Sequence, residues 1–488
     1  MTSALGRQVS PRANEFGVIT ASHPWTSEFG ILLAAIPLTV AIVGAQAVSI
    51  PVVSQAAVTA TILVSVLSPA VGLAVLAFVA PLGPTKAIPA PGSEVLLVGA
   101  ILLGCIYRLP VDRPRARLSA LAVILTAFVV YAAAQQLPEL LNGYRGTLDH
   151  DVGYLFIQLL TCFAAIMAAT YVLSDRSPYP FLVMALAGAT LVAVLALLTY
   201  DVEAIPGFIA GLVPASDNLT RALGSFSNPN YLGAFAAMLT VTAVALATRV
   251  KSWRTFVALI AIAVLIGLGV VVSLSRGAFI ATLVGLAWLA LARSRLLAVV
   301  VLAASVLGAL VVYPAFVEWR LENLAGAASA EAYAIMAQSD RGRLVGTLAG
   351  PLLFMSAPLF GIGFGHFVPM SVLVTGSSDP INAHNWYLTV LAEQGVVGVV
   401  LVILLSVTLV RAMRTRPPTA RTTGFALLGS LAAAAMFLEP PTSFQTLAVP
   451  SIILIATLVS KWHPKAGQIG SVEEASIGRA SPRFESAS

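Results

Sequence analysis

Charged residues are scarce in this sequence. Only 10% of the 488 residues are Asp, Glu, Lys or Arg, whereas about a quarter are charged in a typical soluble protein. Apolar residues make up 58%, and they occur in runs too long for a surface that contacts water. Because about 20 consecutive apolar residues span the hydrocarbon core of a bilayer, this composition excludes an ordinary soluble enzyme and predicts a polytopic membrane protein.

Cysteine is also rare, with two residues in the whole chain. Cys105 and Cys162 both lie inside apolar runs, where small buried side chains are expected rather than a disulfide framework. Residues 1–28 lack the apolar segment of a cleavable signal peptide. The first apolar run is therefore expected to act as the insertion signal.

The apolar runs predict an all-α, polytopic helix bundle with about 12–14 transmembrane helices. The run at 51–81 contains Pro69 and Gly72 and is long enough for one tilted span or two short ones. The runs lie at 30–48, 51–81, 95–107, 118–134, 154–173, 181–198, 231–248, 256–272, 278–291, 296–312, 386–410, 423–437 and 447–459.

These runs divide the chain into four parts. Residues 1–28 form a polar N-terminal segment, 29–199 a first group of membrane helices, 200–460 a second membrane region, and 461–488 a Ser-rich tail predicted to be disordered. The second region contains a long connection at 314–384, just before the span at 386–410. Leu344, Leu348 and Leu352 recur there at helical spacing, which predicts a helix lying in the membrane interface.

Basic residues are concentrated in alternate connections, which sets the expected orientation. The positive-inside rule makes this side cytoplasmic and explains the net charge of +6 without nucleic acid as a partner. The C-terminus is then expected inside, as is the N-terminal segment 1–28 if the run at 51–81 is two spans, and the connection at 314–384 is expected outside. The basic side holds Arg108, Arg113, Arg115, Arg117, Arg176, Arg249, Lys251, Arg254, Arg293, Arg295, Arg411, Arg414, Arg416, Arg421, Lys461 and Lys465, and the other side Lys86, Arg145, Arg221, Arg276, Arg320, Arg341 and Arg343.

Two motifs on the extracytoplasmic side precede the long connection. Arg221 lies upstream of Asn228-Pro229-Asn230, a turn whose asparagines either cap the next helix or bind a substrate. Ser273-Leu274-Ser275-Arg276-Gly277 is a tight reversal between two apolar runs. Its arginine either snorkels to the interface or binds a phosphate through its planar guanidinium.

Two further motifs lie within and after the long connection. Gly342-Arg343 begins the Leu-spaced stretch, and Arg341 beside it is placed to pair with Asp340, so which arginine faces a site is left open. His384-Asn385-Trp386-Tyr387 comes directly before the next span. An imidazole there is either a polar group near water or a general base that works near neutral pH.

In this order and spacing, the motifs resemble those of the bacterial O-antigen ligase and polymerase superfamily. The resemblance covers roughly residues 200–410 and includes NPN with its upstream arginine, SRG, GR, PLFGIGFG, HNWYL and AEQG. Members of that family transfer a glycan from a polyprenyl-diphosphate carrier to an acceptor hydroxyl at the extracytoplasmic face of the inner membrane. They require neither a nucleotide sugar nor a metal.

The resemblance implies a catalytic region at 200–460 and a role for several residues. His384 would deprotonate the acceptor hydroxyl, and Arg221 and Arg343 would bind the carrier diphosphate, whose charge grows as the glycosidic bond breaks. Neither a cofactor nor a metal ligand is implied, and an in-line attack would invert the anomeric carbon. The substrate-binding candidates are Arg276, Arg341, Asn228, Asn230 and Asn385. The chain would thus act as a ligase or polymerase in cell-surface polysaccharide synthesis, with a glycan, lipid or protein as acceptor.

Two other interpretations stay open. A transporter or flippase for a lipid-linked or anionic glycan would place its ionisable residues near the bilayer midplane, whereas these lie at helix ends. A metal-dependent glycosyltransferase would use Asp149-His150-Asp151, because carboxylate oxygens suit Mg²⁺ or Mn²⁺. This tripeptide is expected in an exposed loop.

Overall fold

The fold was described from a computed structural model. It describes residues 28–48, 51–82, 93–112, 120–142, 149–174, 176–200, 221–307, 310–311, 314–315, 318, 327–376, 381–438 and 444–459. Every regular element in these ranges is helical, which confirms the predicted all-α polytopic fold. The expectations for the N-terminal segment before Glu28 and for the tail after Val459 fall outside the described residues.

Eight described helices are long and apolar enough to cross a membrane. They are α1 (Glu28–Val48), α5 (Ala120–Asn142), α6 (Asp149–Ser174), α7 (Tyr179–Leu198), α8 (Pro229–Ala247), α9 (Trp253–Val272), α10 (Arg276–Arg293) and α15 (Trp386–Arg414). The remaining bundle helices are α2 (Pro51–Leu67), α3 (Pro69–Val79), η2 (Ala80–Leu82), α4 (Ser93–Asp112), α11 (Arg295–Leu307), α16 (Pro418–Ala435) and α17 (Phe444–Val459). Each apolar run expected from the sequence overlaps at least one of these helices.

The long run at 51–81 forms two helices rather than one tilted span. Ser68 separates α2 from α3 with an extended backbone (φ −142°), and Pro69 occupies the first turn of α3. Proline is tolerated there because the first N–H groups of a helix have no intrahelical partner, whereas inside a continuous helix it would remove a hydrogen bond.

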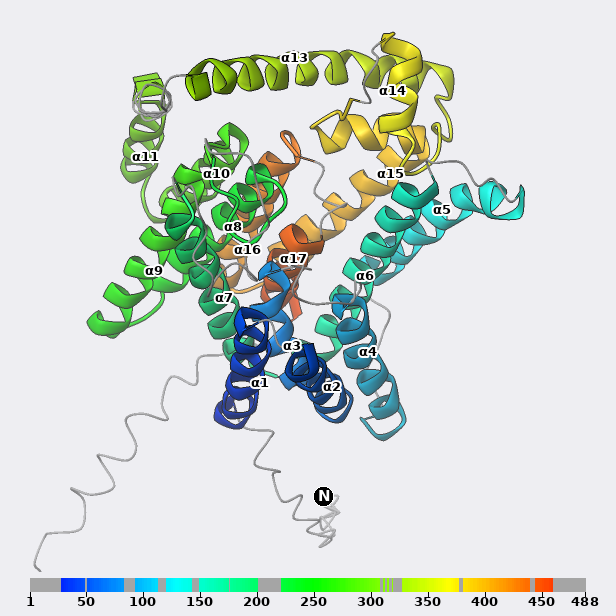
Figure 1. The fold of residues 1–488 in the computed structure, drawn as a ribbon. Helices are drawn as coiled ribbons and strands as arrows, with labels where there is room; N and C mark the ends of the chain where they lie inside the picture. Colours follow the sequence, from blue (N-terminus) through cyan, green and yellow to red (C-terminus); the bar gives the residue numbers. More distant parts are fainter. Residues whose placement is uncertain are drawn as a thin grey trace, which may run out of the picture.

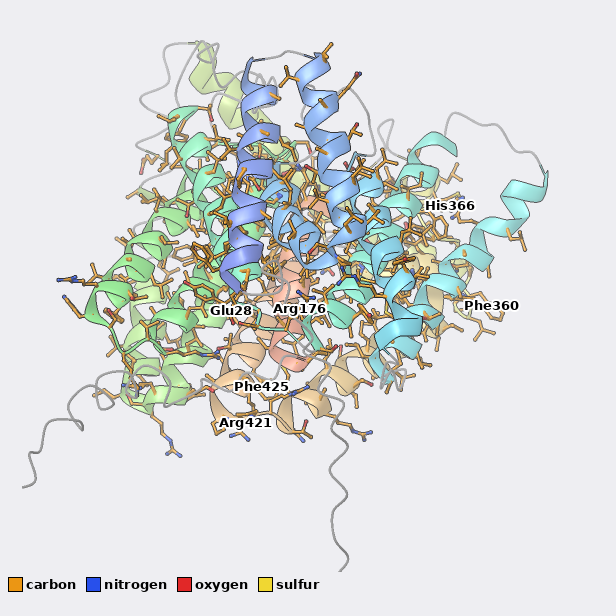
Figure 2. All side chains as sticks on the ribbon, turned by 90° about the horizontal axis from the view of Figure 1, so that it is seen from below. Glu28, Arg176, Phe360, His366, Arg421 and Phe425 are labelled. Carbon is orange, nitrogen blue, oxygen red and sulfur yellow. The ribbon has the colours of Figure 1, made fainter. Side chains whose placement is uncertain are left out.

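The bundle has two chemically different ends. Arg249, just after α8, donates hydrogen bonds to the carbonyl of Thr419 and the hydroxyl of Thr423 near the start of α16. Burial lowers the pKa of Arg249 to about 10. Arg421 lies on the same helix start (Figure 2). The C-terminus of α8 and the N-terminus of α16 thus share one basic end, while the N-termini of α8, α10 and α15 point to the other (Figure 1).

Two helices occupy the long connection at 314–384. They are α13 (Ala327–Ser356) and α14 (Phe367–Thr375). In Figure 1, α13 runs across the top of the bundle from α11 towards α14, transverse to the bundle helices. Leu344, Leu348 and Leu352 are exposed along it, whereas Ala349 and Leu353 are buried. The helix predicted from this spacing is therefore present, and its position in a membrane interface stays a prediction.

A second, smaller core lies beside the main one. It is formed by Ala349 and Leu353 of α13, Phe367 of α14, Ala383, and Ala392 of α15. The main core has large contributions from α3, α7, α8 and α17, and it also includes Leu409 and Met413 from the C-terminal part of α15. The second core therefore packs α13, α14 and the start of α15 into one unit above the bundle.

The loop expected at Asp149-His150-Asp151 is absent. These three residues form the first turn of α6, which begins at Asp149, so the expectation was wrong at this position. Acidic residues are favoured in the first turn of a helix because its N-terminus carries partial positive charge. The α-helical pattern of the apolar run therefore extends back through them.

Candidate functional site

Arg221 is held against the start of α8 by two oxygen acceptors. Its Nε donates to the carbonyl of Ser273 (2.9 Å) and its Nη2 to Oδ1 of Asn230 (2.7 Å). Asn228 is the N-cap of α8, and its side chain accepts a hydrogen bond from the backbone N–H of Asn230 (2.8 Å). In the Asn-Pro-Asn turn, Asn228 therefore caps the helix and Asn230 orients the guanidinium.

The Ser273–Gly277 reversal lies directly beside Arg221, which donates to the carbonyl of Ser273. Ser275 caps α10 by accepting from the N–H of Ala278 (3.4 Å). The reversal packs tightly on α8, since a Cβ at Gly233 would lie 2.6 Å from Oγ of Ser273. Arg276 is the first residue of α10 and its side chain is exposed. The turn thus presents Arg276 at the same end of the bundle as Arg221.

His384 and Arg343 form the second part of the site. The helix α13 approaches residues 382–383 so closely that a Cβ at Gly346 would lie 2.4 Å from the carbonyl oxygen of Asn382. This contact brings Arg343, one turn earlier, near the His384 ring. Burial and, to a smaller extent, the positive charge of Arg343 lower the pKa of His384 below its usual 6.5. The imidazole is therefore neutral at pH 7 and able to accept a proton.

Asn385 and Trp386 fix the helix start that follows His384. The side chain of Asn385 caps α15 by accepting from the N–H groups of Tyr387 (3.0 Å) and Leu388 (3.2 Å). The N–H of Trp386 donates to the carbonyl of Leu438 (3.0 Å), just beyond α16. His384 is therefore anchored directly beside a capped helix rather than in an open loop.

The end of α16 connects the two parts of the site. Phe437 packs on the SRG turn, where a Cβ at Gly277 would lie 2.3 Å from the Phe437 side chain. Its neighbour Leu438 accepts the hydrogen bond from Trp386. The turn that carries Arg276 and the helix start that follows His384 thus both contact the same short segment, residues 437–438 just after α16.

Both parts of the site, the one around Arg221 and the one around His384, contain a residue with a strained backbone. Within the ranges that the structure describes, Leu274 and His384 are the non-glycine residues with positive φ, each at 48°. Such conformations cost roughly 1–3 kcal/mol each and cluster at functional sites. One lies in the SRG reversal and the other is the proposed base, so the strain coincides with two of the four motifs.

The structure distinguishes Arg343 from Arg341. Arg343 is half-buried and acts on His384, whereas the Arg341 side chain is exposed. The side chain of Asp340, the partner expected for Arg341, is outside the described residues. Arg343 is therefore the arginine that faces the histidine. No group of three or more His, Cys, Asp or Glu residues that could hold a metal ion occurs among the described residues.

A break in α15 was not expected from the sequence. Gly395 has non-helical torsion angles (φ 62°, ψ −158°) in the middle of what was expected to be a continuous span. Glu393 is buried, and its Oε1 accepts from the N–H of Phe367 at the start of α14 (2.9 Å). This carboxylate thus ties α14 to the broken helix.

Sequence analysis also missed three polar side chains of α5. Tyr131, Gln135 and Gln136 donate hydrogen bonds to backbone carbonyls at the break and in the PLFGIGFG stretch. The signal was the polarity of Tyr131 within the apolar run at 118–134 and of Gln135 and Gln136 directly after it, because polar residues inside membrane helices are commonly functional.

Comparison with known protein families agrees with the motifs. Residues 261–403 match the family model described as O-antigen ligase. The match contains the SRG reversal, Arg343, His384 and Glu393, and lies downstream of Arg221, Asn228 and Asn230. Among curated proteins, no match to the chain was found.

Proposed function

The chain carries an O-antigen ligase domain, and from this premise we propose that it transfers a glycan from a polyprenyl-diphosphate carrier to an acceptor hydroxyl. Its membership of the superfamily and its apolar helices support a membrane glycosyltransferase-like role in polysaccharide synthesis. The observation that carries the proposal is the pairing of a neutral, half-buried His384 with the guanidinium of Arg343.

In the proposed reaction, His384 acts as the general base. A neutral imidazole accepts the proton of the acceptor hydroxyl as its oxygen attacks the anomeric carbon. The bond from that carbon to the diphosphate oxygen breaks, and the diphosphate leaves on its lipid. Because attack and departure occur on opposite faces of the sugar, the anomeric configuration inverts.

The arginines stabilise the leaving group in this proposal. The diphosphate gains negative charge as the bond breaks, so preorganised guanidinium groups favour the transition state over the ground state. Asn230 and the Ser273 carbonyl orient Arg221 through neutral acceptors, which fix its direction without cancelling its charge. Arg343 contributes the second positive charge, so the residues supply by themselves the charge stabilisation that a divalent cation provides in other enzymes.

The remaining polar candidates are assigned to substrate binding. Exposed Arg276 and Arg341 offer their guanidiniums to the carrier phosphates or the glycan. The side-chain oxygens of Asn228, Asn230 and Asn385 already accept structural hydrogen bonds, so a substrate would meet their amide N–H groups instead. These three are proposed as secondary contacts.

The site is proposed to lie on the extracytoplasmic face of the inner membrane. The basic end of the bundle, with Arg249 and Arg421, would then face the cytoplasm according to the positive-inside rule. The site end would face the compartment in which lipid-linked glycans are assembled into cell-surface polysaccharide.

Transport of a lipid-linked or anionic glycan is the second candidate, and the broken helix α15 is the observation in its favour. Transporters bind their substrates between discontinuous helices near the bilayer midplane. In this chain, however, protein backbone fills the break, since a Cβ at Gly395 would lie 2.6 Å from both the nitrogen of Gly361 and the carbonyl oxygen of Leu359. Glycosyl transfer is therefore favoured.

The test is glycan transfer by purified protein in EDTA, comparing the wild type with Arg221→Ala, Arg343→Ala and His384→Ala. Arg254→Ala is the matched control, because Arg254 is exposed at the opposite, basic end. We expect transfer by the wild type and the control, and loss of about 10²-fold or more in the other three. Activity that needs added metal, or that is unaffected by all three changes, would refute the site assignment.

A further inference from the structure

The break in α15 leaves a short helical segment without support from the rest of its helix. The segment runs from Trp386 to Gln394 and directly follows His384, and beyond it Gly395 departs from helical geometry. Helical hydrogen bonds cannot continue across such a break. In a membrane-spanning region the freed backbone groups need partners within the protein, since lipid offers none.

The PLFGIGFG stretch supplies the first set of partners. The N–H groups of Ile362 and Gly363 donate to the carbonyls of Ala392 (3.0 Å) and Glu393 (2.9 Å). On the other side of the break, the N–H of Val396 donates to the carbonyl of Pro358 (2.9 Å). The stretch at 358–363 thus pairs with the helix on both sides of the break.

The second set comes from α5, a helix outside the family match. The single hydroxyl proton of Tyr131 is shared between the carbonyls of Phe360 (2.8 Å) and Gln394 (3.1 Å). The Nε2 of Gln135 donates to the carbonyls of Phe360 (2.6 Å) and Glu393 (3.1 Å). We call Tyr131, Gln135 and Gln136 the α5 clamp.

Gln136 completes the clamp, four residues further along the same stretch. Its Nε2 donates to the carbonyl of Phe364 (2.5 Å). The Phe364 ring packs with Val129 and Ala132 of α5 and edge-on to Phe156 of α6. Phe360, at the upper end of the stretch, lies on the side of the molecule where α5 lies (Figure 2). The clamp thus fixes the stretch at two carbonyls four residues apart.

The position of the clamp points to the site rather than to packing alone. Polar side chains within a membrane helix are costly and are retained where they have a function, and helices pack against each other readily through small apolar residues. The donors of Tyr131 and Gln135 converge on the base of the segment that follows His384. The upper end of that segment is held by the bond from Trp386 to Leu438.

We propose that Tyr131 and Gln135, with Gln136, are positioning residues that hold His384 in line with the acceptor hydroxyl. This inference rests on the proposed function. The two ends of the segment are fixed by different elements, α5 below and the end of α16 above, so loosening the lower end tilts the segment and moves His384. A misplacement of about 1 Å costs a reaction about 10²-fold in rate.

The experiment compares the double variant Tyr131→Phe/Gln135→Met with Thr126→Val. The double variant removes the donors and keeps side-chain volume, while Gln136 and the Phe364 contacts stay intact. Thr126 lies on the same helix and its hydroxyl donates to the carbonyl of Ala122 within α5 (2.7 Å), so it is a matched control. Transfer kinetics, thermal unfolding, and hydrogen exchange of residues 358–363 and 386–396 are measured on the full-length protein.

We expect kcat of the double variant, assayed below its unfolding temperature, to fall about 10- to 100-fold, with KM for both substrates close to wild type. The unfolding temperature should fall as well, because the carbonyls of Phe360 and Gln394 lose these donors. Hydrogen exchange at the break should rise, and the control should match the wild type in every respect. An unchanged kcat, or a fall in kcat accompanied by a comparable change in KM for both substrates, would overturn the positioning role. If hydrogen exchange at the break is faster in the double variant than in the wild type, but the wild type itself shows no transfer activity, the proposed function fails while the clamp stands.

Discussion

The guanidinium of Arg343 lies close enough to the His384 ring for its charge to lower the pKa of the imidazole, in addition to the larger effect of burial. The two residues belong to different motifs, one on α13 and the other directly before α15. Their proximity follows from the packing of Gly346 on Asn382. A base that must be neutral is thereby kept neutral by a residue proposed to bind the leaving group.

This relationship predicts the pH dependence of transfer. The base works only when unprotonated, so activity should be lost as the pH falls through the pKa of His384, which lies below 6.5. Arg343→Gln removes one of the two causes of the lowered pKa, and the acidic limb should therefore move to higher pH. Arg343→Lys keeps the charge, so its limb should stay with the wild type although its rate falls. The pH profile of kcat/KM, which reports ionisations of the free enzyme, checks this, and coincident limbs for Arg343→Gln and the wild type would contradict it.

A second prediction concerns the glycine that brings α13 to His384. In Gly346→Ala the new Cβ meets the backbone of Asn382 and Ala383 at 2.4 and 3.2 Å. We expect a loss of about 1–3 kcal/mol in unfolding free energy and a lower kcat, because His384 directly follows the displaced residues.

Gly342→Ala provides the comparison for that variant. Gly342 lies on the same helix with nothing within 4 Å of a new Cβ, so alanine should stabilise the helix by about 0.5–1 kcal/mol. Thermal unfolding and transfer rates of the two variants separate the effects. Equal behaviour of both would mean that the contact between Gly346 and Asn382 does not form.

Much of the fold was predictable because the signals for membrane helices depend on residues that are close together in the sequence. Apolar runs, the proline at 69 and the leucine spacing at 344, 348 and 352 each depend on neighbouring residues, and all correspond to helices in the structure. The Asn-Pro-Asn turn likewise indicated a helix cap as one of two alternatives, and the cap at Asn228 involves a residue only two positions away.

The break at Gly395 was not predictable in the same way. A glycine within an apolar run is compatible with a continuous helix, and only its partners show that the helix is interrupted. Those partners are Pro358, Leu359 and Gly361 in the preceding connection and Tyr131 and Gln135 on a distant helix. Hydrogen bonds between residues 30 to 263 positions apart leave no periodic pattern in a sequence.

The geometry of the break yields a third prediction. Gly361→Ala should be much more destabilising than Gly376→Ala, although both glycines have positive φ, at 77° and 65°. Each pays about 1–2 kcal/mol for the left-handed backbone. Gly376 has nothing within 4 Å of a new Cβ, whereas at Gly361 the Cβ would lie 2.2 Å from the Glu393 carbonyl. Unfolding temperatures measured in detergent test the difference, and equal losses would argue against the pairing at the break.

The last prediction concerns the charge of Arg221. Asn230 is buried and orients this arginine through a neutral oxygen at 2.7 Å. Asn230→Asp replaces that acceptor with a carboxylate at the same position, so a buried ion pair forms and the guanidinium loses part of its attraction for the carrier diphosphate. The protein should remain folded, because the new pair is stronger than the original hydrogen bond.

Donor binding should nevertheless weaken in this variant by about tenfold, which corresponds to roughly 1.4 kcal/mol. Asn230→Ser keeps a neutral oxygen at this position and should weaken the donor less than the aspartate does. The measurement is KM for the lipid-linked donor in EDTA at two ionic strengths. Since the aspartate has nearly the shape of the asparagine, an unchanged KM would mean that Arg221 serves α8 and the SRG turn structurally rather than the diphosphate.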